Sequence, residues 1–262
     1  MIDYFDLSPL KEPIIFDTHA HYDDERFKCI EEELFEGLPR HGVGKILTCG
    51  CDGESSQKAL NLAEKYPFVF AAVGIHPGNI DSNTPLEEIS NLAKNKKCVA
   101  IGEIGLDYYW VQDNKEAQKQ IFEKQIELAK ELNLHIIVHD REAHADTLEI
   151  LKKYKPKGVV HSFSGSVEMA EEILKLGMYL GIGGVITFKN ARKLPDVVKM
   201  VPADKFVLET DAPYLTPVPY RSKLNHSAMI YLTAEKIGEL RNISTDEVLK
   251  TTFANACNLF NI

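Results

Sequence analysis

Two histidines, His19 and His21, stand one residue apart at the end of a short apolar run over residues 13–18. Alternate residues of a β-strand point to the same side, so both imidazoles leave the strand toward one point. Neutral imidazole is the commonest nitrogen ligand for borderline metals, and two of them on one rigid strand are already oriented for binding. The pair predicts a metal site, although a single His-x-His pair is a weak signal.

Further residues of metal-binding types follow later apolar runs. The set comprises four histidines and two carboxylates, each at or one to three residues past the predicted carboxyl end of a strand: His19, His21, Glu103, His139, His161 and Asp211. Taken singly, a histidine here could be a core residue bonded to backbone, and Glu103 could be an exposed acid. Their recurrence at one end of different strands favours a metal site. The set is large enough for two metal ions that share a bridging carboxylate.

Short apolar, β-branched runs alternate with amphipathic segments along nearly the whole chain. Eight runs are predicted strands: residues 14–18, 45–49, 69–74, 99–103, 135–139, 158–161, 178–181 and 205–209. The intervening and following segments repeat apolar residues at helical spacing, and they predict helices over residues 26–41, 54–66, 85–94, 115–133, 142–154, 166–176, 194–200, 226–241 and 245–260. Continuously apolar strands are typical of parallel strands buried on both faces. The pattern therefore predicts an α/β fold, a (β/α)8 TIM barrel, as a single domain over residues 1–262.

Composition limits the classes of function. The chain carries a formal charge of −9, with 44% hydrophobic and 26% charged residues, which is ordinary for a soluble globular protein and argues against a large basic surface for wrapping nucleic acid. Its longest apolar run, residues 68–75, is too short to span a bilayer. The first dozen residues do not resemble a secretory signal, so we expect a cytoplasmic protein without membrane contact. Cys49 and Cys51 could ligate a metal, but no second cysteine pair accompanies them.

Several motifs together resemble the TatD family of metal-dependent deoxyribonucleases, within the amidohydrolase-like barrels. The resemblance covers nearly the entire chain in order and is carried by residues 16–21 (FDTHAH), 74–77 (GIHP), 102–109 (GEIGLDYY), 161–165 (HSFSG) and 209–215 (ETDAPYL). It implies a TIM barrel that hydrolyses phosphodiesters, typically from a DNA 3′ end. It also implies a site for one or two divalent metal ions, with Mg²⁺ preferred.

Carried over by position, the resemblance implies a role for each candidate ligand. His19, His21 and Asp211 would hold one metal ion and Glu103 would bridge it to a second. The second ion would be held by His139 and His161. Asp211 is the expected general base for the attacking water, so that Asp211 and Glu103 are the catalytic carboxylates. Because four of the expected ligands are imidazoles, which suit Mn²⁺ and Zn²⁺, these two ions remain alternatives to Mg²⁺.

Contacts to substrate are expected from the same face of the barrel. His76 follows the third predicted strand, and the family pattern implies that it contacts a substrate phosphate; the alternative is a structural histidine before proline. Basic residues of the loops after the seventh and eighth strands should attract phosphates, with Arg221 as the principal candidate: Lys189, Arg192, Lys193, Arg221 and Lys223. The chain departs from the family pattern at Ser222, His226 and Ser227, which leaves the predicted ligands untouched.

A few local contacts of this kind suit single-stranded DNA or 3′ ends better than a long duplex. The alternative function is a metal-dependent esterase, because some TatD-like proteins resemble D-aminoacyl-tRNA deacylases and ester hydrolysis requires the same ligands. We expect the protein to be a monomer.

Overall fold

A computed structural model describes residues 10, 12–80, 85–110 and 113–262. Its strands form one parallel sheet in which sequential strands are neighbours, in the order β1 to β8. Their bounds are β1 (Ile15–Ala20), β2 (Val43–Cys49), β3 (Val69–Val73), β4 (Cys98–Asp107), β5 (His135–Arg141), β6 (Gly158–Val160), β7 (Tyr179–Ile182) and β8 (Phe206–Leu208). The sheet closes on itself where Ala20 bridges Ala212 and the Thr18 hydroxyl donates to the Leu208 carbonyl over 3.0 Å. The fold is the predicted (β/α)8 TIM barrel.

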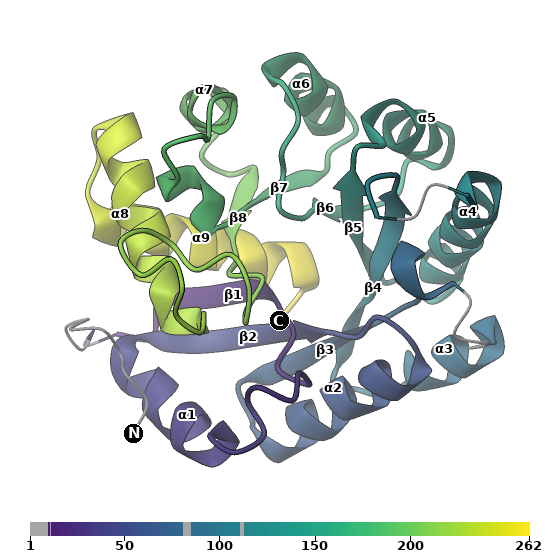
Figure 1. The fold of residues 1–262 in the computed structure, drawn as a ribbon, viewed down its shortest axis with the longest axis horizontal. Coiled ribbons are helices and arrows are strands. Elements are labelled where there is room, and N and C mark those ends of the chain that lie inside the picture. Colours follow the sequence, from purple (N-terminus) through teal and green to yellow (C-terminus); the bar gives the residue numbers. More distant parts are fainter. Residues whose placement is uncertain (1–9, 11, 81–84, 111–112) are drawn as a thin grey trace.

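Helices surround this sheet (Figure 1). They are α1 (Glu31–Gly37), α2 (Gly53–Lys65), α3 (Leu86–Leu92), α4 (Lys115–Glu131), α5 (His144–Tyr154), α6 (Val167–Lys175), α7 (Leu194–Met200), α8 (Ile230–Arg241) and α9 (Thr245–Phe260). Short 3-10 turns are η1 (Leu38–His41), η2 (Pro77–Asn79), η3 (Gly184–Thr187) and η4 (Ser227–Met229). In α4, Phe122, Ile126 and Ala129 recur every three or four residues and are all buried, as an amphipathic helix against a sheet requires. None of the helices in the described ranges is long and apolar enough to cross a membrane.

The last helix closes the end of the barrel where the strands begin. Phe16, near the start of β1, packs against the rings of Phe253 and Phe260 of α9, with centroids 6.1 Å apart in each pair. The Asn255 side chain of α9 donates to the Phe206 carbonyl at the start of β8 over 2.8 Å. In Figure 1, α9 (yellow) lies behind the strands and the C-terminus lies near the middle of the view. In the described part of the chain, side chains of α9 therefore cover this end of the barrel.

Two predicted boundaries are wrong in ways that concern the site. Glu103 does not end its strand, because β4 runs on to Asp107 and its ladder to β5 resumes at Ile104 after an irregularity. The first helix begins at Glu31 instead of residue 26. There, Asp24 Oδ1 accepts hydrogen bonds from the Arg26 backbone over 2.9 Å and the Arg26 side chain over 2.8 Å, which holds the segment in turns.

Candidate metal centre

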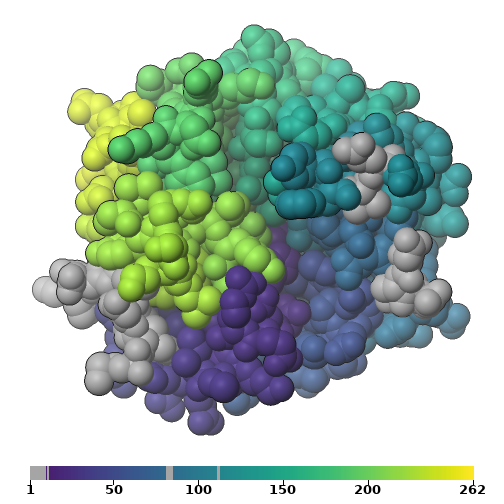
Figure 2. All heavy atoms as spheres, viewed as in Figure 1, coloured from purple at the N-terminus to yellow at the C-terminus, as the bar shows by residue number. Residues whose placement is uncertain are grey.

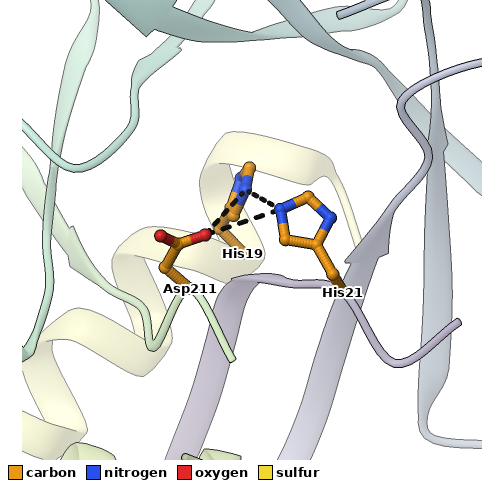
Figure 3. A group of neighbouring side chains, drawn as sticks. All are labelled: His19, His21 and Asp211. Atoms are coloured by element: carbon orange, nitrogen blue, oxygen red, sulfur yellow. Dashed lines mark hydrogen bonds and ion pairs between the residues drawn. The ribbon is translucent and has the colours of Figure 1, made fainter. Parts of the chain in front are cut away.

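The end of β1 brings His19 and His21 to one point together with Asp211, which follows β8. The Nε2 atoms of the two histidines are 3.1 Å apart, and Asp211 Oδ1 lies 3.8 Å from His19 Nε2 and 3.5 Å from His21 Nε2 (Figure 3). The backbone of Asp211 donates to the His19 carbonyl over 2.9 Å, so the closure of the barrel sets these distances. Asp211 has a φ of +57°, a left-handed conformation that aspartate tolerates better than most residues.

A wholly buried aspartate holds this closure in register. Asp17 Oδ1 accepts the Thr210 backbone N–H over 3.0 Å, and its Oδ2 accepts the Thr210 and Ser227 hydroxyls, each over 2.7 Å. Burial raises the pKa of Asp17 to about 7, although these hydrogen bonds act in the opposite direction. Asp17 therefore links β1, which carries the two histidines, to Thr210 and Ser227, which follow β8 as Asp211 does.

Glu103 lies at the centre of the site, and its two oxygens face different pairs of histidines. Oε2 is 3.3 Å from His19 Nε2 and 3.4 Å from His21 Nε2. Oε1 is 2.7 Å from His139 Nδ1 and 2.8 Å from His161 Nε2. Its side chain is only 4% exposed, so the carboxylate is enclosed by imidazoles on both sides. We call Glu103, Asp211 and these four histidines the metal cluster.

The outward-facing nitrogen of each histidine has a polar neighbour, which lies within hydrogen-bond distance for His19, His21 and His139 but not for His161. His139 Nε2 contacts Asp107 Oδ2 over 3.0 Å, and His21 Nδ1 contacts the Cys49 carbonyl over 2.9 Å. His161 Nδ1 lies 3.6 Å from Oε1 of Glu209, an oxygen that also accepts the Ser162 backbone N–H. The Cys49 thiol is 3.5 Å from His19 Nδ1. Such outer contacts leave the inner nitrogens free to bind a metal and orient them toward it.

Both carboxylates of the metal cluster are ionised in this environment. Burial by itself raises the pKa of Glu103, but its charge interaction with His161 and its hydrogen bond with His139 outweigh burial and hold that pKa well below its usual range. Burial likewise raises the pKa of Asp211, and its hydrogen bond and charge interaction with His21 bring the net pKa below the usual value. Two ionised carboxylates among imidazoles form a donor set of the kind that binds divalent cations, so the residues fit a metal centre.

His76 adds a neutral imidazole beside this cluster. Its Nε2 lies 3.7 Å from Glu103 Oε1, and burial, opposed by Glu103, lowers its pKa to about 4. The Gly78 backbone N–H donates to Nδ1 over 3.0 Å, so the single ring proton sits on Nε2. His76 is therefore a hydrogen-bond donor that points into the site.

The metal cluster lies at the base of an open cavity of about 750 Å³. In Figure 2 this face is hollowed near its centre, between the purple segment after β1, the teal segment after β4 and the lime segment after β8. Its walls include Arg141, Trp110 and Tyr214, besides the cluster residues other than His19, which lies beneath the surface. Ser162 and Ser164 also line a smaller neighbouring pocket that contains Arg192 and Lys193. The cavity can admit a substrate larger than a single phosphate.

The structure brings together all six predicted ligands and His76, but not Arg221. The Arg221 guanidinium donates to the Thr216 carbonyl over 2.9 Å and lies 3.8 Å above the Phe188 ring, and Arg221 does not line the described part of the cavity. Asp107 and Glu209 were not assigned roles from the sequence, although both belong to the quoted motifs. The Cys51 thiol lies 3.8 Å from His21 Nδ1 and groups with His21 and Glu103, so the cysteine pair does border the site.

A TIM barrel with such a cluster at the carboxyl ends of its strands defines a metal-dependent hydrolase. The chain belongs to the family of TatD-related DNases, whose family model matches residues 16–261. It is 42% identical over 256 residues to YabD of Bacillus subtilis, described as an uncharacterized metal-dependent hydrolase, with coverage of 95% of this chain and 100% of YabD. The crystal structure of YjjV, a TatD homolog from Escherichia coli, has 34% identity and a TM-score of 0.89 over 95% of this chain and 98% of YjjV. A TatD family hydrolase from Entamoeba histolytica, 23% identical, shares the fold with a TM-score of 0.85 over 94% of this chain and 97% of that protein.

Proposed function

We propose that this protein is a cytoplasmic deoxyribonuclease that removes nucleotides from the 3′ ends of DNA with the help of two divalent cations. The observation that carries the proposal is the position of Glu103, because each of its oxygens faces a different histidine pair at 2.7–3.4 Å. A carboxylate shared in this way can bridge two cations, and two-cation sites clamp the attacking and the leaving oxygen of a phosphodiester.

We assign the ligands to the two cations as the family resemblance implies. His19, His21 and Asp211, whose ligand atoms lie close together, would hold one cation. His139 and His161, whose Nδ1 and Nε2 atoms are 3.3 Å apart, would hold the other. When bound, the cations would supply Lewis acidity that polarises the phosphodiester and lowers the pKa of water. Carboxylate and phosphate oxygens favour Mg²⁺ or Mn²⁺, while the four imidazoles leave Zn²⁺ as the competing metal.

Asp211 is the proposed general base. Its side chain is 20% exposed against 4% for Glu103, so Asp211 is the carboxylate that an incoming water and phosphate can approach. Because its pKa is held below the usual value, Asp211 is ionised at neutral pH and can accept the proton that the attacking water loses. Glu103, enclosed by imidazoles, serves to hold the two halves together.

Other side chains would bind the phosphate. The Nε2–H of neutral His76 can donate to a phosphate oxygen, and because the ring is neutral no positive charge on His76 has to be buried. Arg141 lines the cavity beside it, and Arg192 and Lys193 lie in the adjoining pocket. These charges are local, which reconciles a DNA substrate with a net charge of −9. The location in the cytoplasm is supported by five free cysteines, as is usual in a reducing compartment.

The test is an assay on single-stranded DNA labelled at one end, with Mg²⁺, Mn²⁺ or Zn²⁺. A 3′ label should leave at once as a mononucleotide, whereas a 5′-labelled strand should shorten stepwise. D-aminoacyl-tRNA is assayed in parallel; its hydrolysis without cleavage of DNA would replace the nuclease by the esterase. Release of short internal fragments first would contradict action from 3′ ends.

Variants separate this activity from a contaminating nuclease. Asp211→Asn at saturating metal should lower kcat by roughly 10²- to 10⁴-fold, the usual contribution of a general base, with little change in KM. Asp196→Asn is the matched control, since Asp196 lies on α7 with its side chain 69% exposed. Equal activity of the two variants would exclude Asp211 as the base.

A further inference from the structure

Exposed aromatic side chains gather around the mouth of the cavity. Among the residues that the structure describes, the exposed large hydrophobic side chains all lie in two loops at the carboxyl end of the barrel: Tyr109, Trp110, Tyr214 and Val218. The first two follow β4 and the others follow β8, and these strands lie on opposite sides of the barrel because the sheet runs in order from β1 to β8. Trp110, 70% exposed, and Tyr214, 49% exposed, both line the cavity.

The backbone of each of these two aromatic residues is held by an aspartate of the site. The backbone N–H groups of Tyr109 and Trp110 donate to Asp107 Oδ1 over 2.9 and 2.8 Å, and the other oxygen of Asp107 contacts His139. The backbone N–H of Tyr214 donates to the Asp211 carbonyl over 2.8 Å. Trp110 therefore stands three positions beyond Asp107, which contacts the metal cluster, and Tyr214 stands three positions beyond Asp211, which belongs to it. The backbone of each aromatic residue is held close to the cluster.

An arginine accompanies each aromatic residue. The Arg141 guanidinium lies 4.4 Å from the Tyr109 ring centroid and 5.4 Å from that of Trp110. The Arg26 guanidinium lies 4.3 Å from the Tyr214 centroid and is held by both oxygens of Asp24. A flat apolar surface beside a cation suits a ligand that presents flat rings and negative charge together, which is the chemistry of an unpaired nucleotide strand.

We propose that Trp110 and Tyr214 are stacking surfaces for unpaired nucleobases on opposite sides of the metal cavity. The proposal rests on the nucleic-acid function proposed above. Bases in a duplex are stacked on one another and paired, and only an unpaired strand can offer successive base faces to both rings. Stacking would also cover apolar ring surface that is now in contact with water.

The sequence supplies a direct probe, because Trp110 is the one tryptophan of the chain. Metal-loaded protein is titrated with a short oligothymidylate made resistant to cleavage by phosphorothioate linkages, and the indole fluorescence is recorded. An oligomer of equal length and charge without bases, and a blunt duplex, are the matched ligands. Base-dependent quenching is the expected result. Equal affinity for the oligomers with and without bases would overturn the proposal, and so would tighter binding of the duplex.

Variants assign the effect to the ring. Trp110→Ala should weaken binding of the base-bearing oligomer by about 5- to 150-fold, the range for one base stacked on an aromatic ring, and leave the abasic oligomer unaffected. Trp110→Phe should retain most of the affinity, and Val218→Ala, an exposed apolar control in the β8 loop that does not line the cavity, should change nothing. Binding is followed by the anisotropy of a dye on the oligomer. A loss that is the same for both oligomers would show a fault in folding or charge and would refute stacking.

The stacking proposal and the proposed nuclease activity can fail separately. If bases quench the fluorescence of Trp110 and strengthen binding but no phosphodiester is cleaved, the stacking proposal is supported and the nuclease proposal is refuted. The opposite outcome is that the protein cleaves DNA, while Trp110→Ala, Tyr214→Ala and the double variant all bind single strands with the affinity of the parent. The nuclease proposal is then supported and the stacking proposal is refuted.

Discussion

Replacement of Asp107 by asparagine tests whether the outer contacts of the cluster control metal binding. Asp107 accepts three N–H groups: Oδ1 takes those of Tyr109 and Trp110, and Oδ2 takes that of His139 Nε2. An amide has one accepting oxygen. If that oxygen stays on the two backbone groups, the amide NH₂ faces His139 Nε2, which must then accept. The ring proton moves to Nδ1, the atom that lies 2.7 Å from Glu103 and faces the metal position.

The size of the effect follows from that exchange. A hydrogen bond to a charged partner is worth about 1.5–3 kcal/mol, and a factor of ten in affinity corresponds to about 1.4 kcal/mol. Asp107→Asn should therefore weaken metal binding at the His139 and His161 half by roughly 10- to 150-fold. This agrees with the loss of about 10- to 100-fold that is typical when the partner of a metal-binding histidine is removed.

The assay is a competition titration of Mn²⁺ or Zn²⁺ against a chromophoric chelator, with kcat/KM measured at low and saturating metal. Saturating metal should restore most of the rate, because the ligands themselves are intact. Asp146→Asn is the matched control: Asp146 accepts the Tyr108 hydroxyl and a Lys119 ion pair near the same loop, each over 2.7 Å, without touching the cluster. Unchanged metal affinity in Asp107→Asn, or an equal loss in both variants, would refute the reasoning.

Three other outcomes are expected. Removal of metal with EDTA should abolish hydrolysis and Mg²⁺ or Mn²⁺ should restore it; turnover in metal-free buffer would contradict a metal-dependent reaction. Glu103→Gln should reduce both metal content, measured by elemental analysis, and rate, and normal content would show that Glu103 does not bridge. The hydrogen bond to Asp140, over 2.8 Å, raises the pKa of His144. Because the folded pKa is the higher one, the stabilisation is complete below the unfolded value of about 6.5 and is lost as pH rises through the folded pKa. The melting temperature of His144→Gln should therefore lie furthest below that of the parent at acid pH. If this difference in melting temperature does not shrink toward alkaline pH, the His144–Asp140 hydrogen bond is not the source of the stabilisation.

The alternation of apolar runs with amphipathic segments was sufficient to predict the barrel, because each predicted strand overlaps one strand of the sheet. It could not predict the length of β4. The apolar run over residues 99–103 predicted a strand that stops at Glu103. In the structure Glu103 and Asp107 both lie within β4, where imidazoles and backbone N–H groups compensate the buried charge. Compensation by residues of other strands cannot be read from a local pattern.

The positions of the candidate ligands were predictable for a geometric reason, and the residues that support them were not. A residue at the carboxyl end of a barrel strand points to the shared mouth whatever its neighbours are, so strand position places His19 or His161 near the site. Asp17 acts through Thr210, which is 193 residues away, and that pairing exists only after the barrel closes. The side chain of Arg221 depends in the same way on the course of its loop, which directs it to Thr216 and Phe188.

Asp107, which contacts the cluster, and Asp211, which belongs to it, would connect metal binding to the proposed binding of bases. Asp107 holds His139 with one oxygen and the backbone of Tyr109 and Trp110 with the other, and Asp211 combines a metal-facing carboxylate with a carbonyl that fixes Tyr214. A shift of either aspartate therefore moves a metal ligand and an aromatic ring together. Changes at Asp107 and Trp110 should consequently be non-additive, since both lie in one chain of contacts. If the nuclease and stacking proposals both hold, such a site would set the distance from the reacting phosphate to the neighbouring base, and it would disfavour a strand whose bases are held in a duplex.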